Sequence, residues 1–214
     1  MPTPTVQIHA ARSGAHAPNN NSIIATLRAI APQRLANFEH SLRLAERQAA
    51  IATNDQQAVD QIPIDLIIER SRIRIEYSLD QHLPRASFWD VTARQWVIQL
   101  RWADTWKQHR FHIAHEFKRI LDHGKERQLY PSGSSICLAC QAESAADHFA
   151  RHFLVPAHLL RRAQQAGLTD TTTLADIFGI TEDVIRDRLG YTDDHSRDDC
   201  ASPVTHHQPR RAPI

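Results

Sequence analysis

Apolar side chains recur at helical spacing near the start of the chain, between residues 22 and 60. Charged side chains lie between them, as on an amphipathic helix. Pro32 should separate a short helix from a longer one, because proline cannot continue a helix. The apolar positions of the longer helix fall on one stripe: Phe38, Leu42, Leu44, Ala45, Ala49 and Ile51. We therefore predict a pair of N-terminal helices within residues 22–60.

The middle of the chain carries the pattern of strands. A helix should open after Pro63, with Asp65 in its first turn, where the helix dipole favours an acid. Residues 72–79 then alternate polar and apolar side chains, and so do residues 95–102. The turn-like residues 81–87 separate them. One face of the second strand is apolar: Trp96, Ile98 and Leu100.

Helical patterns return in the second half. A helix over residues 111–123 should end at Gly124, and a loop should follow up to about residue 139. Three more helical stretches come later, over residues 143–155, 158–166 and 173–189. A small sheet with helices packed on it, an α+β fold, is the simplest architecture for this order of elements.

The composition of the chain argues against several classes of protein. The 25 basic and 24 acidic residues nearly cancel, which argues against a strongly basic nucleic-acid surface. The chain has no apolar run long enough to cross a membrane and no apolar signal stretch at its start, so we expect a cytoplasmic protein without membrane partners. Its 3 cysteines suit a reducing compartment. Residues 1–21 and 192–214 lack hydrophobic period, and we expect disordered tails there.

The segment FHIAHEF, from Phe111 to Phe117, nearly spells a zinc-peptidase helix. In the motif H-E-x-x-H, two histidines one turn apart bind one zinc ion, and the glutamate activates a water molecule. His115 and Glu116 fit the first two positions. Position 119 holds arginine instead of the second histidine, so the motif is broken at a ligand.

Two motifs together resemble the ImmA/IrrE family of metallopeptidases. The first runs from Arg110 to Glu116, and the second, ESAADHFARHFLVP, begins at Glu143. The resemblance implies a zincin-like domain over residues 63–190. It also implies zinc as the cofactor, His115 and Glu143 as zinc ligands and Glu116 as the general base. Members of this family cut a repressor or another regulatory protein.

Arg119 puts zinc binding and catalysis in question, because a guanidinium has no lone pair to offer a metal. If its side chain points inward, we expect it to bridge Glu143 and Glu116 in place of the ion; Asp122 is another partner within reach. If it points outward, a substitute ligand is needed. The candidates are His112, Cys140 and His123, although Cys137 and Cys140 are more simply explained as two reduced thiols. Lys118 is a second departure, since the family often has glycine there.

Residues 173–190 resemble a helix-turn-helix, with Gly179 to reverse the chain and Thr181 to cap the next helix. Arg186 and Arg188 are offset there by Glu182, Asp183 and Asp187. We therefore favour a packing or partner-binding role for this segment over DNA binding.

Three functions remain open. The first is a zinc endopeptidase acting on a repressor or regulatory partner. The second is a non-catalytic pseudo-peptidase that binds such a partner on the same scaffold. The third, which the charge pattern disfavours, is a DNA-binding transcriptional regulator. The residue at position 119 distinguishes the endopeptidase from the pseudo-peptidase, and an arginine there weighs against ordinary catalysis.

Overall fold

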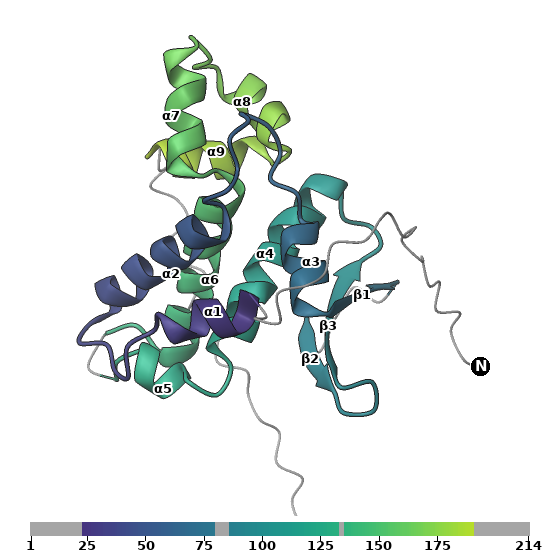
Figure 1. Cartoon of the computed structure of the whole chain (residues 1–214), viewed down its shortest axis with the longest axis vertical. Coiled ribbons are helices and arrows are strands. Elements are labelled where there is room, and N and C mark those ends of the chain that lie inside the picture. The colour runs from purple at the N-terminus through teal and green to yellow at the C-terminus, as the bar shows by residue number, and fades with distance from the viewer. Residues whose placement is uncertain (1–22, 80–85, 133–134, 191–214) are drawn as a thin grey trace, which may run out of the picture.

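A long helix that carries the HE motif, α4 (Trp106–Asp122), lies between a small sheet and a second long helix, α6 (Leu138–Leu154) (Figure 1). The structure, a computed structural model, describes residues 23–79, 86–132 and 135–190. The expected tails lie outside the described residues. Helix α2 (Phe38–Ala52) covers the other side of α6. The α+β class is confirmed.

The sheet has the order β1-β3-β2 and consists of β1 (Ile73–Ser78), β2 (Ser87–Asp90) and β3 (Gln95–Arg101). Strand β1 runs parallel to β3, and β2 runs antiparallel to it. The sequence pattern predicted β1 and β3 but not β2, whose first residue was assigned to a turn. Strand β2 is too short to show a period, yet it forms the edge of the sheet beside α4.

The two motif helices begin earlier than their apolar patterns predicted. Helix α4 starts at Trp106 because Thr105 and Gln108 form a capping box, in which each side chain bonds the other's backbone N–H. Helix α6 starts at Leu138, where the Cys137 sulfur accepts a hydrogen bond from the backbone N–H of Cys140 at 3.1 Å. The C-x-x-C spacing is thus the spacing of a helix cap.

The remaining helices follow the predictions with small changes. Helices α1 (Ile23–Ala29), α3 (Asp65–Ser71), α7 (Ala157–Gln165), α8 (Thr171–Phe178) and α9 (Glu182–Leu189) lie where helices were expected. The expected loop after Gly124 contains a short helix, α5 (Glu126–Leu129). On α2 the predicted stripe is wrong at Ile51, which is 40% exposed.

The core is built where α4, α6 and the sheet meet. Phe117 of α4 packs on Phe149 of α6, with ring centroids 5.9 Å apart, and Phe149 stacks on Phe153. All three rings are fully buried. No helix in the described ranges is long and apolar enough to cross a membrane.

Helices α8 and α9 are fastened to the start of α4. Gly179 ends α8 with φ +64°, and a Cβ there would lie 2.7 Å from Gln61 and 2.9 Å from Trp106, so only glycine fits. Arg110 donates to the carbonyl oxygens of Gly179 and Ile62 at 3.0 and 2.8 Å. Thr181 takes the N-cap position of α9 but makes no side-chain cap bond, contrary to the prediction.

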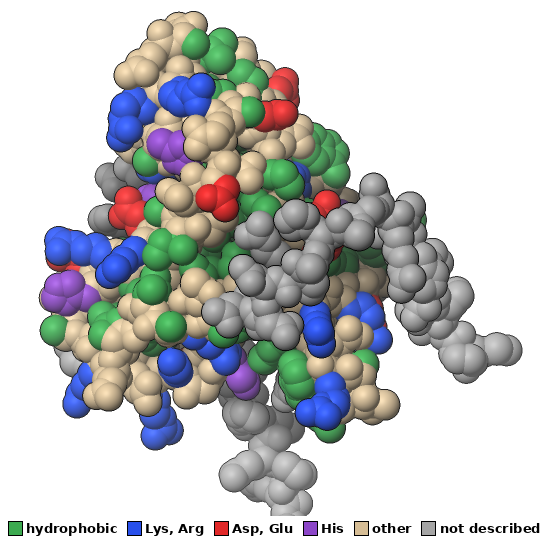
Figure 2. All heavy atoms as spheres, in the orientation of Figure 1, with side chains coloured by type: hydrophobic (Ala, Val, Ile, Leu, Met, Phe, Trp, Pro, Cys, Tyr) green, Lys and Arg blue, Asp and Glu red, His purple; other side chains and the backbone are tan. Residues whose placement is uncertain are grey.

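The basic residues of α9 are engaged by protein groups. Arg186 pairs with Glu182 and Asp183 at 2.8 and 2.9 Å, and Arg188 donates to the carbonyl oxygen of Val155. Figure 2 shows basic side chains spread over several parts of the visible face rather than gathered on one. This arrangement gives α9 little free positive charge for a phosphate backbone.

A buried ion pair lies inside the motif helix. Lys118 donates to Asp122 at 2.7 Å, and their side chains are only 1% and 5% exposed. The hydroxyl of Tyr130 donates to the other Asp122 oxygen. Asp122 was a candidate partner for Arg119; the structure assigns it to Lys118 and Tyr130 instead, because both of those groups are buried and need an acceptor.

Removing the charge of Asp122 should therefore leave the buried Lys118 ammonium without a counter-ion. We expect Asp122→Asn to lower the free energy of unfolding by about 3–5 kcal/mol, because a buried charge is left without its counter-ion. Adding Lys118→Met should recover most of the loss. Urea unfolding of the two variants measures this difference. Equal losses in the single and double variants would show that the ion pair is not the cause.

Candidate active site

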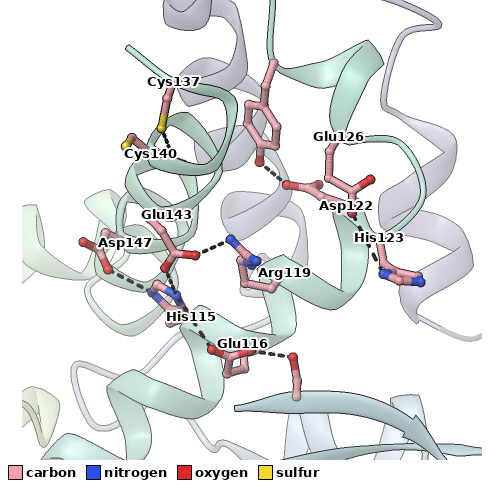
Figure 3. Close-up of polar contacts among 12 residues, drawn as sticks. His115, Glu116, Arg119, Asp122, His123, Glu126, Cys137, Cys140, Glu143 and Asp147 are labelled. Atoms are coloured by element: carbon pink, nitrogen blue, oxygen red, sulfur yellow. Dashed lines mark hydrogen bonds and ion pairs between the residues drawn. The ribbon is translucent and has the colours of Figure 1, made fainter. Parts of the chain in front are cut away.

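His115 of α4 and Glu143 of α6 face each other across the helix pair (Figure 3). The His115 Nε2 atom lies 3.1 Å from the Glu143 Oε2 atom. The His115 side chain is 15% exposed, while that of Glu143 is 54% exposed at the rim. The two motifs of the sequence therefore converge in space, as predicted.

Asp147 completes the surroundings of the imidazole. Its Oδ1 atom lies 2.9 Å from His115 Nδ1, so both ring nitrogens face carboxylates. Burial by itself lowers the pKa of His115, but the hydrogen bonds to Asp147 and Glu143 outweigh it and raise the pKa to about 9. His115 is therefore an imidazolium at neutral pH. Sequence analysis missed this role of Asp147, although its position one turn after Glu143 was a usable signal.

Arg119 points toward α6, although its side chain stays 38% exposed at the rim of the site. Its Nη1 atom donates to Glu143 Oε1, on the carboxylate that also contacts His115 (Figure 3). The hydrogen bond from His115 and the charge of Arg119 hold the pKa of the Glu143 carboxyl below its ordinary value. The predicted bridge is therefore confirmed at Glu143, with which Arg119 pairs. It is wrong at Glu116, to which Arg119 makes no bond.

Glu116 is held by the sheet instead. The Ser87 hydroxyl on β2 donates to Glu116 Oε2 at 2.5 Å, and the carboxylate is almost fully buried. Its other oxygen, Oε1, lies 3.9 Å from the Nε2 atoms of His112 and His115. The sequence carried no signal for Ser87, because the strand that positions it was not predicted.

A cavity of about 470 Å³ opens beside Arg119, between β2 and the end of α4. We refer to it as the β2 cavity. Trp89 and Trp96 contribute aromatic walls, while Arg119, His123 and Glu126 contribute polar groups. Trp89 is 46% exposed, so part of this aromatic surface is accessible to solvent.

Comparison with known proteins agrees with this geometry. Residues 69–190 match the family model of the M78 peptidases, the IrrE N-terminal-like domain. The chain belongs to the IrrE N-terminal-like domain family. The resemblance to the ImmA/IrrE proteins is thereby confirmed. A search of the curated proteins finds no match to the chain.

A solved structure from Mycobacterium tuberculosis, described as a transcriptional regulator, has a similar fold. The TM-score is 0.52 at 18% sequence identity, and the match covers 82% of this chain. It covers 53% of the mycobacterial chain, so the present chain spans about half of that protein's length. The similarity bears on the fold alone.

The residues of this IrrE-like domain do not fit the zinc ion that the family implies. Catalytic zinc needs three protein ligands with free lone pairs. Here Arg119 has none, and His115 Nε2 and Glu143 are bonded to each other. Within the described ranges, no third His, Cys, Asp or Glu joins these two in a compact set of ligand atoms.

The proposed substitute ligands have other surroundings in the IrrE-like domain. His112 lies near Glu116, and burial lowers the pKa of its imidazole. Cys140 lies in the first turn of α6, where its N–H bonds the Cys137 sulfur. His123 is 65% exposed and packs edge-on against Trp96. Glu143 is thus paired with Arg119 and His115 rather than with any of these candidates.

The raised pKa of His115 makes the stability of the domain depend on pH. Its folded value of about 9 exceeds the ordinary 6.5, so the stabilisation is complete below pH 6.5 and is lost as the pH rises through 9. We expect the wild type to lose roughly 2–3 kcal/mol more than His115→Gln over this interval. Chemical unfolding with a chelator present measures it. Parallel pH curves for the two proteins would contradict the imidazolium assignment.

Proposed function

We propose that this IrrE-like chain is a non-catalytic member of its family that binds a regulatory protein through the β2 cavity. One observation carries the proposal: the Arg119 guanidinium pairs with Glu143 at the position where the family motif has its second zinc histidine. A fixed cation takes the place of the metal ion beside that carboxylate.

Charge and ligand number both disfavour zinc at this site. Two like unit charges about 4 Å apart repel by roughly 4 kcal/mol at the effective dielectric of a protein surface, and zinc carries two charges. The ion would also lack one of its usual three ligands. Without it, no Lewis acid polarises a peptide carbonyl, and Glu116 bonded to Ser87 has no metal-bound water to activate.

The β2 cavity supports binding of a protein partner. Strand β2 is one edge of the sheet, so among the described residues one side of its backbone has no partner strand, and such an edge can pair with an extended segment. Trp89 lines the cavity next to this edge, and exposed tryptophans are frequent anchors of protein interfaces. A repressor or other regulatory protein is the partner class that the family implies, and the mycobacterial neighbour is itself named a transcriptional regulator.

Two other functions have weaker support. A zinc endopeptidase would need a third ligand beside His115 and Glu143. Among the described residues, none of His112, Cys140 and His123 joins those two in a compact set of ligand atoms, although the buried His112 Nε2 atom makes no hydrogen bond there. A DNA-binding role would need free basic groups on α9, where Arg186 is paired with Glu182 and Asp183.

Restoring the histidine should restore the metal site. We expect Arg119→His to bind one zinc equivalent more than the wild type, because two imidazoles one turn apart would again face Glu143. The hydrogen bond that His115 Nδ1 donates to Asp147 Oδ1 already has the arrangement that orients a zinc-bound histidine. Arg119→Gln is the matched control, since it removes the charge without adding a ligand. Elemental analysis of dialysed protein gives the three stoichiometries.

A lower zinc content in the Glu143→Gln variant than in the wild type would contradict the proposal. It would mean that Glu143 binds zinc in the wild type. Arg119→Gln should gain no zinc; an equal gain in both Arg119 variants would assign the effect to charge alone.

Partner binding should depend on Trp89. We expect the wild type to bind the regulatory protein encoded beside its gene without cleaving it, and Trp89→Ser to weaken binding about tenfold or more, as for an interface anchor. Trp102→Ser is the control, because Trp102 is 57% exposed but does not line the cavity. Calorimetry measures affinity and gel electrophoresis detects fragments. Cleavage by the wild type would refute the non-catalytic assignment.

A further inference from the structure

A second cluster of possible metal ligands lies on the other side of α6. It consists of Glu46 on α2 and His148 and His152 on α6. His152 follows Glu143 by about two and a half helical turns, so it faces away from the candidate active site. The two sites therefore share a helix but no ligand.

The three side chains have the spacing of a ligand set. One ligand atom from each lies within 4.8 Å of the others. The two histidines are one turn apart on α6, with ring centroids separated by 4.1 Å. Two histidines at this spacing with a carboxylate from another helix form the usual three-ligand zinc site, which keeps a fourth position open.

The hydrogen bonding of His152 directs its free ring nitrogen at a carboxylate. Its Nδ1 atom donates to the carbonyl oxygen of His148 at 2.8 Å, which places the lone pair of the neutral ring on Nε2. That Nε2 atom lies 3.6 Å from Glu46 Oε1. A lone pair and a carboxylate oxygen repel at this distance unless a proton or a metal ion lies between them.

The surroundings of the cluster lower the pKa of both histidines. Burial, the neighbouring His152 and two arginines lower the pKa of His148 to about 4. Burial and the charge of Arg188 hold the pKa of His152 below its ordinary value. Both rings thus offer lone pairs at neutral pH. Arg188 and Arg151, the nearby cations, bond to the Val155 carbonyl and to Asp187 respectively.

These arginines also select the kind of ion. Their charge opposes any cation, so binding must come from strong bonds to nitrogen and not from charge attraction alone. Calcium and magnesium prefer oxygen ligands, whereas zinc bonds well to imidazole. A site with two imidazoles and one carboxylate therefore suits zinc.

We propose that Glu46, His148 and His152 bind a zinc ion that ties α2 to α6. The ion satisfies His152 Nε2 and the Glu46 carboxylate together, and it fastens the N-terminal helices to the domain. This site is independent of the Arg119 site, and its occupancy says nothing about peptidase activity.

Zinc titration of the full-length, metal-free chain tests this proposal. We expect one zinc ion per chain by calorimetry and a rise in Tm on binding, since zinc binds only the folded site. Glu46→Gln and His152→Gln should each weaken binding by about 10- to 100-fold or more. They should also remove the zinc-dependent rise in Tm. Glu46 is 52% exposed, so Glu46→Gln should fold even if His152→Gln does not.

Three matched controls locate the ion. His40→Gln changes an exposed histidine on α2, His115→Gln changes the active-site motif, and a double change of His206 and His207 to Gln addresses the C-terminal segment. All three should bind zinc as the wild type does. Unchanged affinity in Glu46→Gln and His152→Gln, loss of binding in any control, or no zinc binding by the wild type would overturn the proposal.

Discussion

The packing of α4 against α6 is the constraint on which the rest of the structure depends. Phe117 and Phe149 fill the contact. Alanines at Ala114, Ala146 and Ala150 are fully buried and allow close approach of helices. This contact sets the distance between the motif residues above it. It brings His115 and Glu143 together before any metal is considered, so the geometry of the site survives the change at position 119.

The Arg119 guanidinium supplies positive charge beside Glu143, as a zinc ion would, but it cannot act as a Lewis acid. It neutralises Glu143, and the imidazolium of His115 does the same from the other side. Neither cation can accept a lone pair from a substrate carbonyl as a metal ion does. Because Arg119 and Glu143 are 38% and 54% exposed, their pair should contribute about 1 kcal/mol or less to stability. The Arg119–Glu143 pair therefore adds little to the stability of the domain.

Two faces of helix α6 carry different groups of possible ligands. Glu143 and Asp147 face α4, whereas His148 and His152 lie near Glu46 of α2. The second face is thus separate from the motif residues that face α4. Among the described residues, β2 lies at one edge of the sheet, and Trp89 on it is partly exposed.

Sequence alone predicted the features that depend on local pattern. The α+β class, β1, β3 and the motif helices follow from hydrophobic period, and the pairing of His115 with Glu143 follows from the family motifs. Strand β2 and its Ser87 were missed, because four residues carry no period. The partner of Asp122 was wrong, because helical spacing makes both Lys118 and Arg119 neighbours and only burial decides between them. Glu46 was not linked to His148 and His152, since nothing local connects residues so far apart in sequence.

The most direct test of the central claim is a crystal structure of the full-length protein grown with zinc, with anomalous diffraction recorded at the zinc edge. Our account predicts no anomalous peak between His115 and Glu143, with the Arg119 guanidinium bonded to Glu143 as in the present structure. A peak within about 2.2 Å of both His115 Nε2 and a Glu143 oxygen, with Arg119 turned away, would contradict it.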